Sequence, residues 1–87
     1  MIEKEIEIAN RAGIHTRPAS MIVKLTAKYK SDIFLIRDGF SINAKSIIGV
    51  MTLAAEQGAK LTIRADGEDE KEAVKELAKL FIDGFGE

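Results

Sequence analysis

The sequence has no cysteine and no tryptophan, and it has one proline and one histidine among 87 residues. The absence of cysteine excludes a disulfide framework and a thiolate metal site, and it fits a reducing compartment. A single histidine leaves too few ligands for a metal centre, so we expect no metal and no cofactor. Because no apolar run approaches the roughly 20 residues of a membrane span, we expect a cytoplasmic protein without membrane insertion.

An excess of charge of one sign is also missing. The formal net charge is −1, so electrostatics gives no case for nucleic-acid binding. A hydrophobic content of 46% and a charged content of 31% are typical of a globular chain, and we expect one domain over residues 1–87. Residues 1–30 carry six Lys/Arg against three Glu, whereas residues 56–87 carry five against nine acidic residues. A solvated surface is the better explanation of this asymmetry, and a mildly basic docking surface for acidic protein partners is the alternative.

The spacing of the apolar residues predicts seven elements of secondary structure. Alternation with a period of two, or a short β-branched run, predicts strands over residues 2–8, 32–37, 40–43 and 61–65. Helical spacing predicts helices over residues 16–29 and 47–55, and a third that follows Asp69 and ends near Asp83. Asp38-Gly39 is a favoured pair for a two-residue hairpin turn. The order β-α-β-β-α-β-α favours an α+β fold, in which helices cover one face of a four-stranded antiparallel sheet.

Two of the predicted helices have candidate N-caps. Ser46 directly precedes the second helix and belongs to the residue types that cap best. Asp69 precedes the third helix, and together with Glu72 in the first turn it resembles a capping box. We therefore expect both helices to begin with side-chain bonds to first-turn N–H groups.

The histidine and the proline lie three positions apart, in a segment that also holds a glycine and an arginine. Gly13 suits a sharp turn, and Pro18 suits the first turn of a helix, where its missing N–H has no intrahelical partner. The segment therefore predicts a loop that delivers His15 to a helix N-terminus. Unpaired N–H groups and the helix dipole favour anions there, and the planar donors of Arg17 suit phosphate oxygens.

The chemistry of His15 can be narrowed by exclusion. No cysteine, serine or carboxylate constellation surrounds it in the sequence, so a hydrolytic triad has no support. The residue does not lie at a core-periodic position, so packing does not account for it. A neutral imidazole has a free ring nitrogen that can accept a phosphoryl group and pass it on. The residues alone indicate a phosphoryl-accepting histidine and go no further.

Three motifs extend this interpretation. Gly13–Ala19 (GIHTRPA) resembles the active-site signature of the HPr family, the histidine-containing phosphocarriers of the bacterial phosphoenolpyruvate:sugar phosphotransferase system. Asn43–Leu53 (NAKSIIGVMTL) is similar to the regulatory serine segment of that family. A looser likeness covers Gly58-Ala59 and Gly67–Glu70. The resemblance implies the HPr-like open-faced β-sandwich as the fold, with three helices on one face of the sheet.

The resemblance also implies how the first motif works. His15 would accept a phosphoryl group on Nδ1 from phosphorylated enzyme I and pass it to the IIA domain of a sugar permease. Arg17 would neutralise the phosphoryl oxygens, while Thr16 and Pro18 would form the helix N-terminus at the site. Such a protein is a carrier within a relay rather than a free-standing enzyme.

The second motif implies regulation and partner binding. In the family, the serine at the position of Ser46 can be phosphorylated by an ATP-dependent kinase, so an HPr kinase/phosphorylase is an expected partner. Capping alone would also account for this serine. Transcriptional regulators are a further class of partner, and the chain is expected to be a monomer. The residues expected to contact partners are Met21, Lys24, Ile47, Ile48 and Met51.

Two positions depart from the family pattern. Ala12 stands where some members carry a polar residue, so one hydrogen bond to the phosphoryl group is expected to be missing. Ile48 replaces a methionine often found there, which leaves partnership with transcriptional regulators open. His15 argues against a regulatory paralogue that lacks this histidine.

Three alternatives remain from the sequence alone. Carriers of the nitrogen branch share the histidine motif, and the serine segment only leans away from them. A small α/β effector-binding module could use His15 to bind a ligand without becoming phosphorylated. A purely structural domain would explain the motifs as turn and cap chemistry.

Overall fold

The computed structural model describes residues 1–87 and has four strands and three α-helices. In chain order they are β1 (Ile2–Glu7), α1 (Thr16–Thr26), β2 (Asp32–Arg37), β3 (Phe40–Asn43), α2 (Ile47–Thr52), β4 (Lys60–Asp66) and α3 (Glu70–Ile82), followed by a 3₁₀ turn, η1 (Gly84–Gly86). This order is the predicted β-α-β-β-α-β-α. None of the helices is both long enough and apolar enough to span a bilayer.

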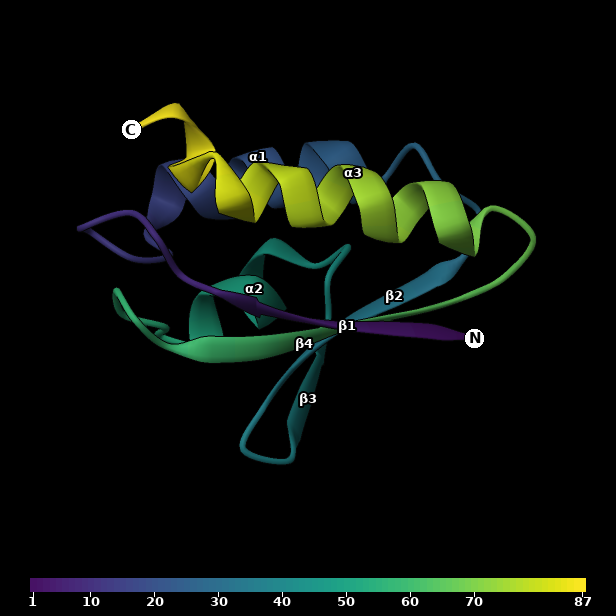
Figure 1. Ribbon diagram of the computed structural model, residues 1–87, viewed down its shortest axis with the longest axis horizontal. Helices are drawn as coiled ribbons and strands as arrows, with labels where there is room; N and C mark the ends of the chain where they lie inside the picture. The colour runs from purple at the N-terminus through teal and green to yellow at the C-terminus, as the bar shows by residue number, and fades with distance from the viewer.

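The strands form one antiparallel sheet in the order β1-β4-β2-β3. Helices α1 and α3 lie side by side across one face of this sheet, and the short α2 is drawn below α1, which it contacts (Figure 1). The hairpin between β2 and β3 is as predicted, because Asp38 and Gly39 both have positive φ, 49° and 81°, as its tight turn requires. The predicted α+β fold with an open-faced sheet is therefore confirmed.

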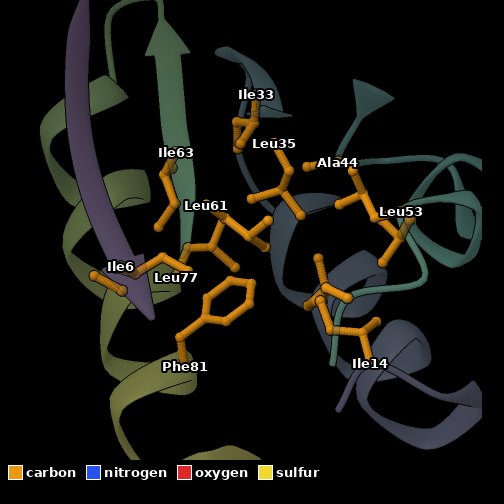
Figure 2. Packing of buried hydrophobic residues seen from close by; sticks show 14 of the residues in the cluster. Ile6, Ile14, Ile33, Leu35, Ala44, Leu53, Leu61, Ile63, Leu77 and Phe81 are labelled. Carbon is orange, nitrogen blue, oxygen red and sulfur yellow. The ribbon is translucent and has the colours of Figure 1, made fainter. Parts of the chain in front are cut away.

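The core lies between the sheet and the helices. Alternate residues of the strands point to α3, where Leu77 and Phe81 meet Leu61 and Ile63 (Figure 2). Ile14, from the loop before α1, is buried at the other side of the same cluster, near Leu53. This burial anchors the residue next to His15, so the histidine loop is fixed by the core and not only by its own turn.

Two helices end earlier than predicted. Helix α1 ends at Thr26 and not at Tyr29, because the N–H groups of Lys28 and Tyr29 bond to carbonyls only three residues back. The buried Thr26 hydroxyl also donates to the Ala44 carbonyl at 2.9 Å, which ties the end of the helix to the segment after β3. The periodicity of the sequence continues past Thr26, but the backbone hydrogen bonds of Lys28 and Tyr29 are no longer those of an α-helix.

Helix α2 ends at Thr52 and not at Ala55. Ala54 has φ of 48°, which a helix cannot contain. The Arg37 guanidinium donates to the Leu53 and Ala54 carbonyls and forms an ion pair with Glu56 at 2.8 Å. These bonds join β2 to the segment between α2 and β4.

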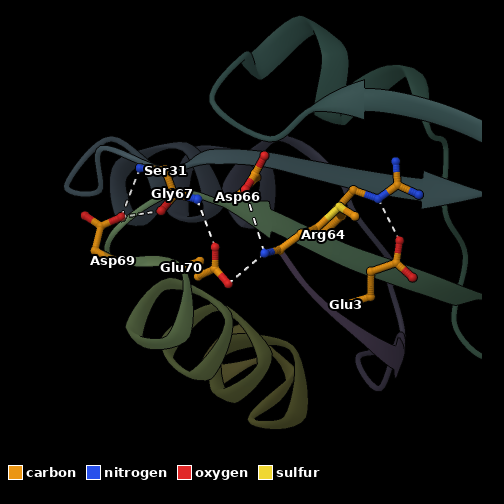
Figure 3. A network of polar contacts seen from close by, with 8 residues as sticks. Glu3, Ser31, Arg64, Asp66, Gly67, Asp69 and Glu70 are labelled. Atoms are coloured by element: carbon orange, nitrogen blue, oxygen red, sulfur yellow. Dashed lines mark hydrogen bonds and ion pairs between the residues drawn. The ribbon is translucent and has the colours of Figure 1, made fainter.

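The predicted capping box before α3 is wrong. Asp69 is the N-cap residue, but its side chain makes no capping hydrogen bond. Its carboxylate instead accepts a bond from the Lys30 N–H at 2.8 Å. It also accepts bonds from the Ser31 N–H, at 2.9 Å, and from the Ser31 hydroxyl (Figure 3). Glu70 accepts from the Gly67 N–H at 3.0 Å. Asp69 therefore joins α3 to the start of β2, a long-range contact that the local sequence pattern does not reveal.

Acid should weaken the fold through Asp69. The Ser31 hydroxyl and the Lys30 N–H lower the pKa of Asp69 from 3.8 to about 2. A carboxylate with a lowered pKa stabilises the fold above its unfolded pKa and loses that contribution as pH falls through its folded pKa. We expect urea titrations of wild type and Asp69→Asn to differ most above pH 4 and to converge as pH falls from 4 to 2.

A matched control for this prediction is Asp32→Asn, which removes the same charge from an exposed position on β2. Its acid profile should run parallel to that of wild type. Other carboxylates with lowered pKa, such as Glu56, remain in every variant, so only the difference between the curves is diagnostic. An Asp69→Asn curve parallel to wild type from pH 5 to 2 would contradict the assignment.

Candidate functional site

The loop before α1 holds His15 through a close backbone contact. The Ile14 N–H donates to the Ala55 carbonyl at 2.9 Å, and Gly13 has φ of 71°. A Cβ atom on Gly13 would lie 2.4 Å from the Ala55 oxygen, so only glycine fits this approach. The sharp turn predicted at Gly13 is therefore confirmed, and it fixes where α1 begins.

His15 is the N-cap residue of α1, with extended backbone angles and no side-chain capping bond. Its carbonyl accepts from the Ala19 N–H at 3.0 Å. The N–H groups of Thr16 and Arg17 make no hydrogen bond within the protein, and Pro18 has no N–H to place. No acidic residue lies in the first turn, so the unpaired donors and the dipole favour an anion beside the imidazole.

The structure places a carboxylate in this site. Glu87 Oε2 lies 2.8 Å from His15 Nε2 and 3.2 Å from Arg17 Nη1. The His15 side chain is 43% exposed and that of Arg17 is 56% exposed, whereas that of Glu87 is 21% exposed. The expectation that no carboxylate accompanies His15 holds for its sequence neighbours and fails in space, because Glu87 is 72 residues away.

The last turn of the chain brings Glu87 to this position. Gly84, Phe85 and Gly86 all have positive φ, at 60°, 59° and 74°, which reverses the chain after α3. Phe85 is fully buried and packs edge-on against Phe81, with 5.1 Å between ring centroids. This burial holds a non-glycine residue in a left-handed conformation that is otherwise unfavourable. The turn is therefore anchored by the core and not left free in solvent.

Asn10 links the histidine loop to Glu87. It is 5% exposed, and its amide donates to the Gly13 carbonyl at 2.8 Å and to Glu87 Oε1 at 2.9 Å. The Asn10 amide, followed by the His15 ring and Arg17, lowers the pKa of Glu87. Sequence reasoning missed both residues, since no spacing rule links positions 77 apart. The only local signal was the paired glycines at 84 and 86, which indicate a turn but not its direction.

The second motif lies on α2, which contacts α1. Ser46 is its N-cap as predicted, and Ser46 Oγ accepts from the Gly49 N–H at 3.1 Å. Ile47, Ile48 and Met51 are 41%, 75% and 43% exposed, which is unusual for large apolar side chains. The helix therefore presents an apolar surface to solvent.

Met21 and Lys24, the other two expected partner-contact residues, lie on α1. They follow Arg17 at helical spacing, which places them on the same side of the helix. There they line a shallow groove between α1 and α3, together with Leu80 and Lys79. The expected partner-contact residues therefore fall in two groups, one on α1 toward α3 and one on α2. The structure brings together no cluster of His, Asp or Glu side chains suited to a metal ion.

Comparison with known proteins gives a consistent result. A family model described as the HPr component phosphorylation site of the phosphotransferase system matches residues 2–83. The phosphocarrier protein HPr of Treponema pallidum is 42% identical over 87 residues, covering 100% of this chain and 99% of its own. The HPr-like protein Crh of Bacillus subtilis is 42% identical over 78 residues, covering 90% of this chain and 92% of its own.

Solved structures agree. A crystal structure of HPr from Thermoanaerobacter tengcongensis has a TM-score of 0.96 and 44% identity, covering 100% of this chain and 98% of that one. A structure of an HPr dimer from the same organism has a TM-score of 0.80. The expected monomeric state of this chain therefore stays a prediction. The match along nearly the whole sequence, at this identity and with this fold, shows that the chain belongs to the HPr family of phosphocarrier proteins of the phosphotransferase system.

Proposed function

We propose that this phosphocarrier accepts its phosphoryl group on His15 from phosphorylated enzyme I and passes it to the IIA domains of sugar permeases, in the cytoplasm. One observation carries the proposal. A half-exposed imidazole belongs to the N-cap residue of a helix whose first N–H groups are unpaired, and the Arg17 guanidinium belongs to the first turn of that helix. That arrangement offers a nucleophile and anion donors at one open point of the surface.

The transfer itself needs little from the carrier. The lone pair of His15 Nδ1 forms the new N–P bond while the N–P bond on enzyme I breaks, and its electron pair returns to the donor nitrogen. Free donors of the Arg17 guanidinium and the N–H groups of Thr16 and Arg17 balance the charge on the phosphoryl oxygens. Because the site is shallow and exposed, the group is held without being trapped, as reversible transfer requires.

The alternatives fit the site less well. An effector-binding module would need an enclosed cavity, whereas the structure has only a shallow groove that does not include His15. A purely structural role would leave the unpaired N–H groups and the exposed imidazole without a purpose. A carrier of the nitrogen branch would use the same site, so that alternative differs only in its partners.

The proposal is tested by incubating the protein with enzyme I and phosphoenolpyruvate and measuring its intact mass. One phosphoryl adduct that is lost in acid is expected. A protein that gains no mass under conditions that phosphorylate another HPr would rule the proposal out. Presenting sugar-branch and nitrogen-branch IIA domains to the loaded protein then distinguishes the two branches by which domain receives the group.

We further propose that Ser46 is a regulatory site, phosphorylated by an HPr kinase/phosphorylase and read by partners, transcriptional regulators among them. Its hydroxyl lies at the start of α2, where a dianion is tolerated by the free N–H groups. The exposed Ile47 and Ile48 directly follow it, and the exposed Met51 lies on the next turn. An added charge there would oppose a partner that docks acidic groups on the basic residues of α1.

Ser46→Asp should mimic this effect. Aspartate also caps helices well, so the fold should persist while the rate of phosphoryl uptake from enzyme I falls about tenfold, which corresponds to ~1.4 kcal/mol of docking energy. Ser41→Asp is the matched control, because Ser41 is an exposed serine on β3. Stopped-flow or quenched-flow rates that fall equally in both variants would show that charge alone, and not its position, slows the reaction.

A further inference from the structure

We propose that Glu87 is a positioning residue for phosphoryl transfer, holding the His15 proton on Nε2 so that the Nδ1 lone pair faces the incoming phosphoryl group, and that Asn10 holds Glu87 in place. The inference rests on the proposed function, since it concerns how the same histidine is made ready. It assigns a purpose to the last residue of the sequence and to a buried amide that neither motif contains.

The first step is the tautomer. A neutral imidazole carries one proton, and the partner of one ring nitrogen decides which nitrogen bears it. Glu87 Oε2 lies 2.8 Å from His15 Nε2, and an ionised carboxylate can only accept hydrogen bonds. The proton therefore resides on Nε2. Nδ1 makes no hydrogen bond within the protein and keeps its lone pair for attack on phosphorus.

The second step is charge. When Nδ1 binds the phosphoryl group and Nε2 keeps its proton, the ring gains positive charge. The Glu87 carboxylate, already bonded to Nε2, balances that charge without moving, as the carboxylate partner of a catalytic histidine does. No proton needs to leave or reach His15 during either transfer. Arg17 bonds to the same carboxylate oxygen through Nη1 alone, which leaves its other donors for the phosphoryl oxygens.

The third step is how firmly the carboxylate is held. Asn10 is buried and donates both to Gly13, in the histidine loop, and to Glu87 Oε1, so one amide fixes the two parts relative to each other. The turn before Glu87 is left-handed at three successive residues and is held by the buried Phe85 ring. The turn and the bonds from Asn10, His15 and Arg17 therefore hold the Glu87 carboxylate beside the imidazole before any phosphoryl group arrives.

The tautomer can be measured directly, because His15 is the only histidine of the chain and gives the only imidazole signals. Ring ¹⁵N NMR of wild type at pH 8 should show the His15 imidazole protonated at Nε2 and unprotonated at Nδ1. Glu87→Ala should show a mixture of both tautomers. Its rate of phosphoryl uptake from enzyme I should fall about 10-fold to 100-fold, by analogy with the loss seen when the carboxylate partner of a metal-bound histidine is removed.

Glu5→Ala is the matched control, since Glu5 is exposed on β1 and its side chain forms no hydrogen bond or ion pair. Asn10→Ala should shift the tautomers and lower the rate in the same direction as Glu87→Ala, with Glu87 intact. Either unchanged ring ¹⁵N shifts in Glu87→Ala, or a rate equal to that of Glu5→Ala, overturns the inference. Failure of the proposed function is distinct from these results, because wild type itself would then gain no phosphoryl group while its ring spectrum could still be read.

Discussion

His15→Ala is expected to abolish the phosphoryl adduct, because the covalent intermediate forms on the imidazole and alanine has no group that can accept phosphorus. The sequence holds no second histidine that could replace it. The hydroxyl of Ser46 is not a substitute, since no base lies within hydrogen-bond reach of it and its oxygen is bonded to the Gly49 N–H. Incubation with enzyme I and phosphoenolpyruvate, followed by intact mass, measures the loss.

The fold of this variant should survive, because the His15 side chain is half-exposed and its only side-chain bond is to Glu87. Urea unfolding of His15→Ala should therefore stay within about 0.5 kcal/mol of wild type, as for other surface changes. His15→Gln gives a second test with a similar volume. An acid-labile adduct on either variant would move the acceptor to another residue and contradict the proposal.

The fold could be predicted in detail wherever local pattern and tertiary structure agree. The alternation of Leu61, Ile63 and Ala65 predicts β4 because one face of the strand is buried, and that burial is what the structure shows. Ser46 could be identified as an N-cap because its bond reaches only to Gly49. The turn at Asp38-Gly39 needs only the positive φ of its own two residues. Each of these features is decided within a few residues of itself.

The features that escaped prediction are decided by distant segments. Asp69 fits a capping box by spacing, yet its carboxylate bonds to Lys30 and Ser31 because the fold brings β2 within reach. Helix α1 ends at Thr26, whose hydroxyl bonds to the distant Ala44 carbonyl. Neither partner can be read from a sequence window around the residue concerned.

The residues of the candidate site also divide into those that the local sequence predicts and those that only the fold brings together. His15, Arg17 and Pro18 lie in one short segment and could be singled out together. Asn10 and Glu87 join the same site from opposite ends of the chain, through a turn whose direction depends on the burial of Phe85. The residues that would carry the phosphoryl group are thus local, and those that orient the imidazole are not.

Phe81→Ala is expected to be the most destabilising single change in the core, lowering the free energy of unfolding by about 3–5 kcal/mol. The ring is fully buried, and it points from α3 into the cluster formed with Leu61 and Leu77 (Figure 2). Alanine would leave a cavity there and remove the aromatic contact with Phe85. Because small domains are stable by only about 5–15 kcal/mol, the urea midpoint should fall steeply or folding should fail.

Ile82→Ala is the matched control for Phe81→Ala, since Ile82 is the next residue of α3 and is 67% exposed. It should change the free energy of unfolding by less than about 0.5 kcal/mol. Phe81→Leu, which fills most of the cavity, should cost less than alanine and keeps the comparison measurable if Phe81→Ala does not fold. Equal urea midpoints for Phe81→Leu and Ile82→Ala would contradict the role given to this ring. Phe81 also packs against Phe85, so Phe81→Leu should loosen the turn that holds Glu87. Folded Phe81→Leu should therefore take up a phosphoryl group on His15 more slowly than Ile82→Ala does.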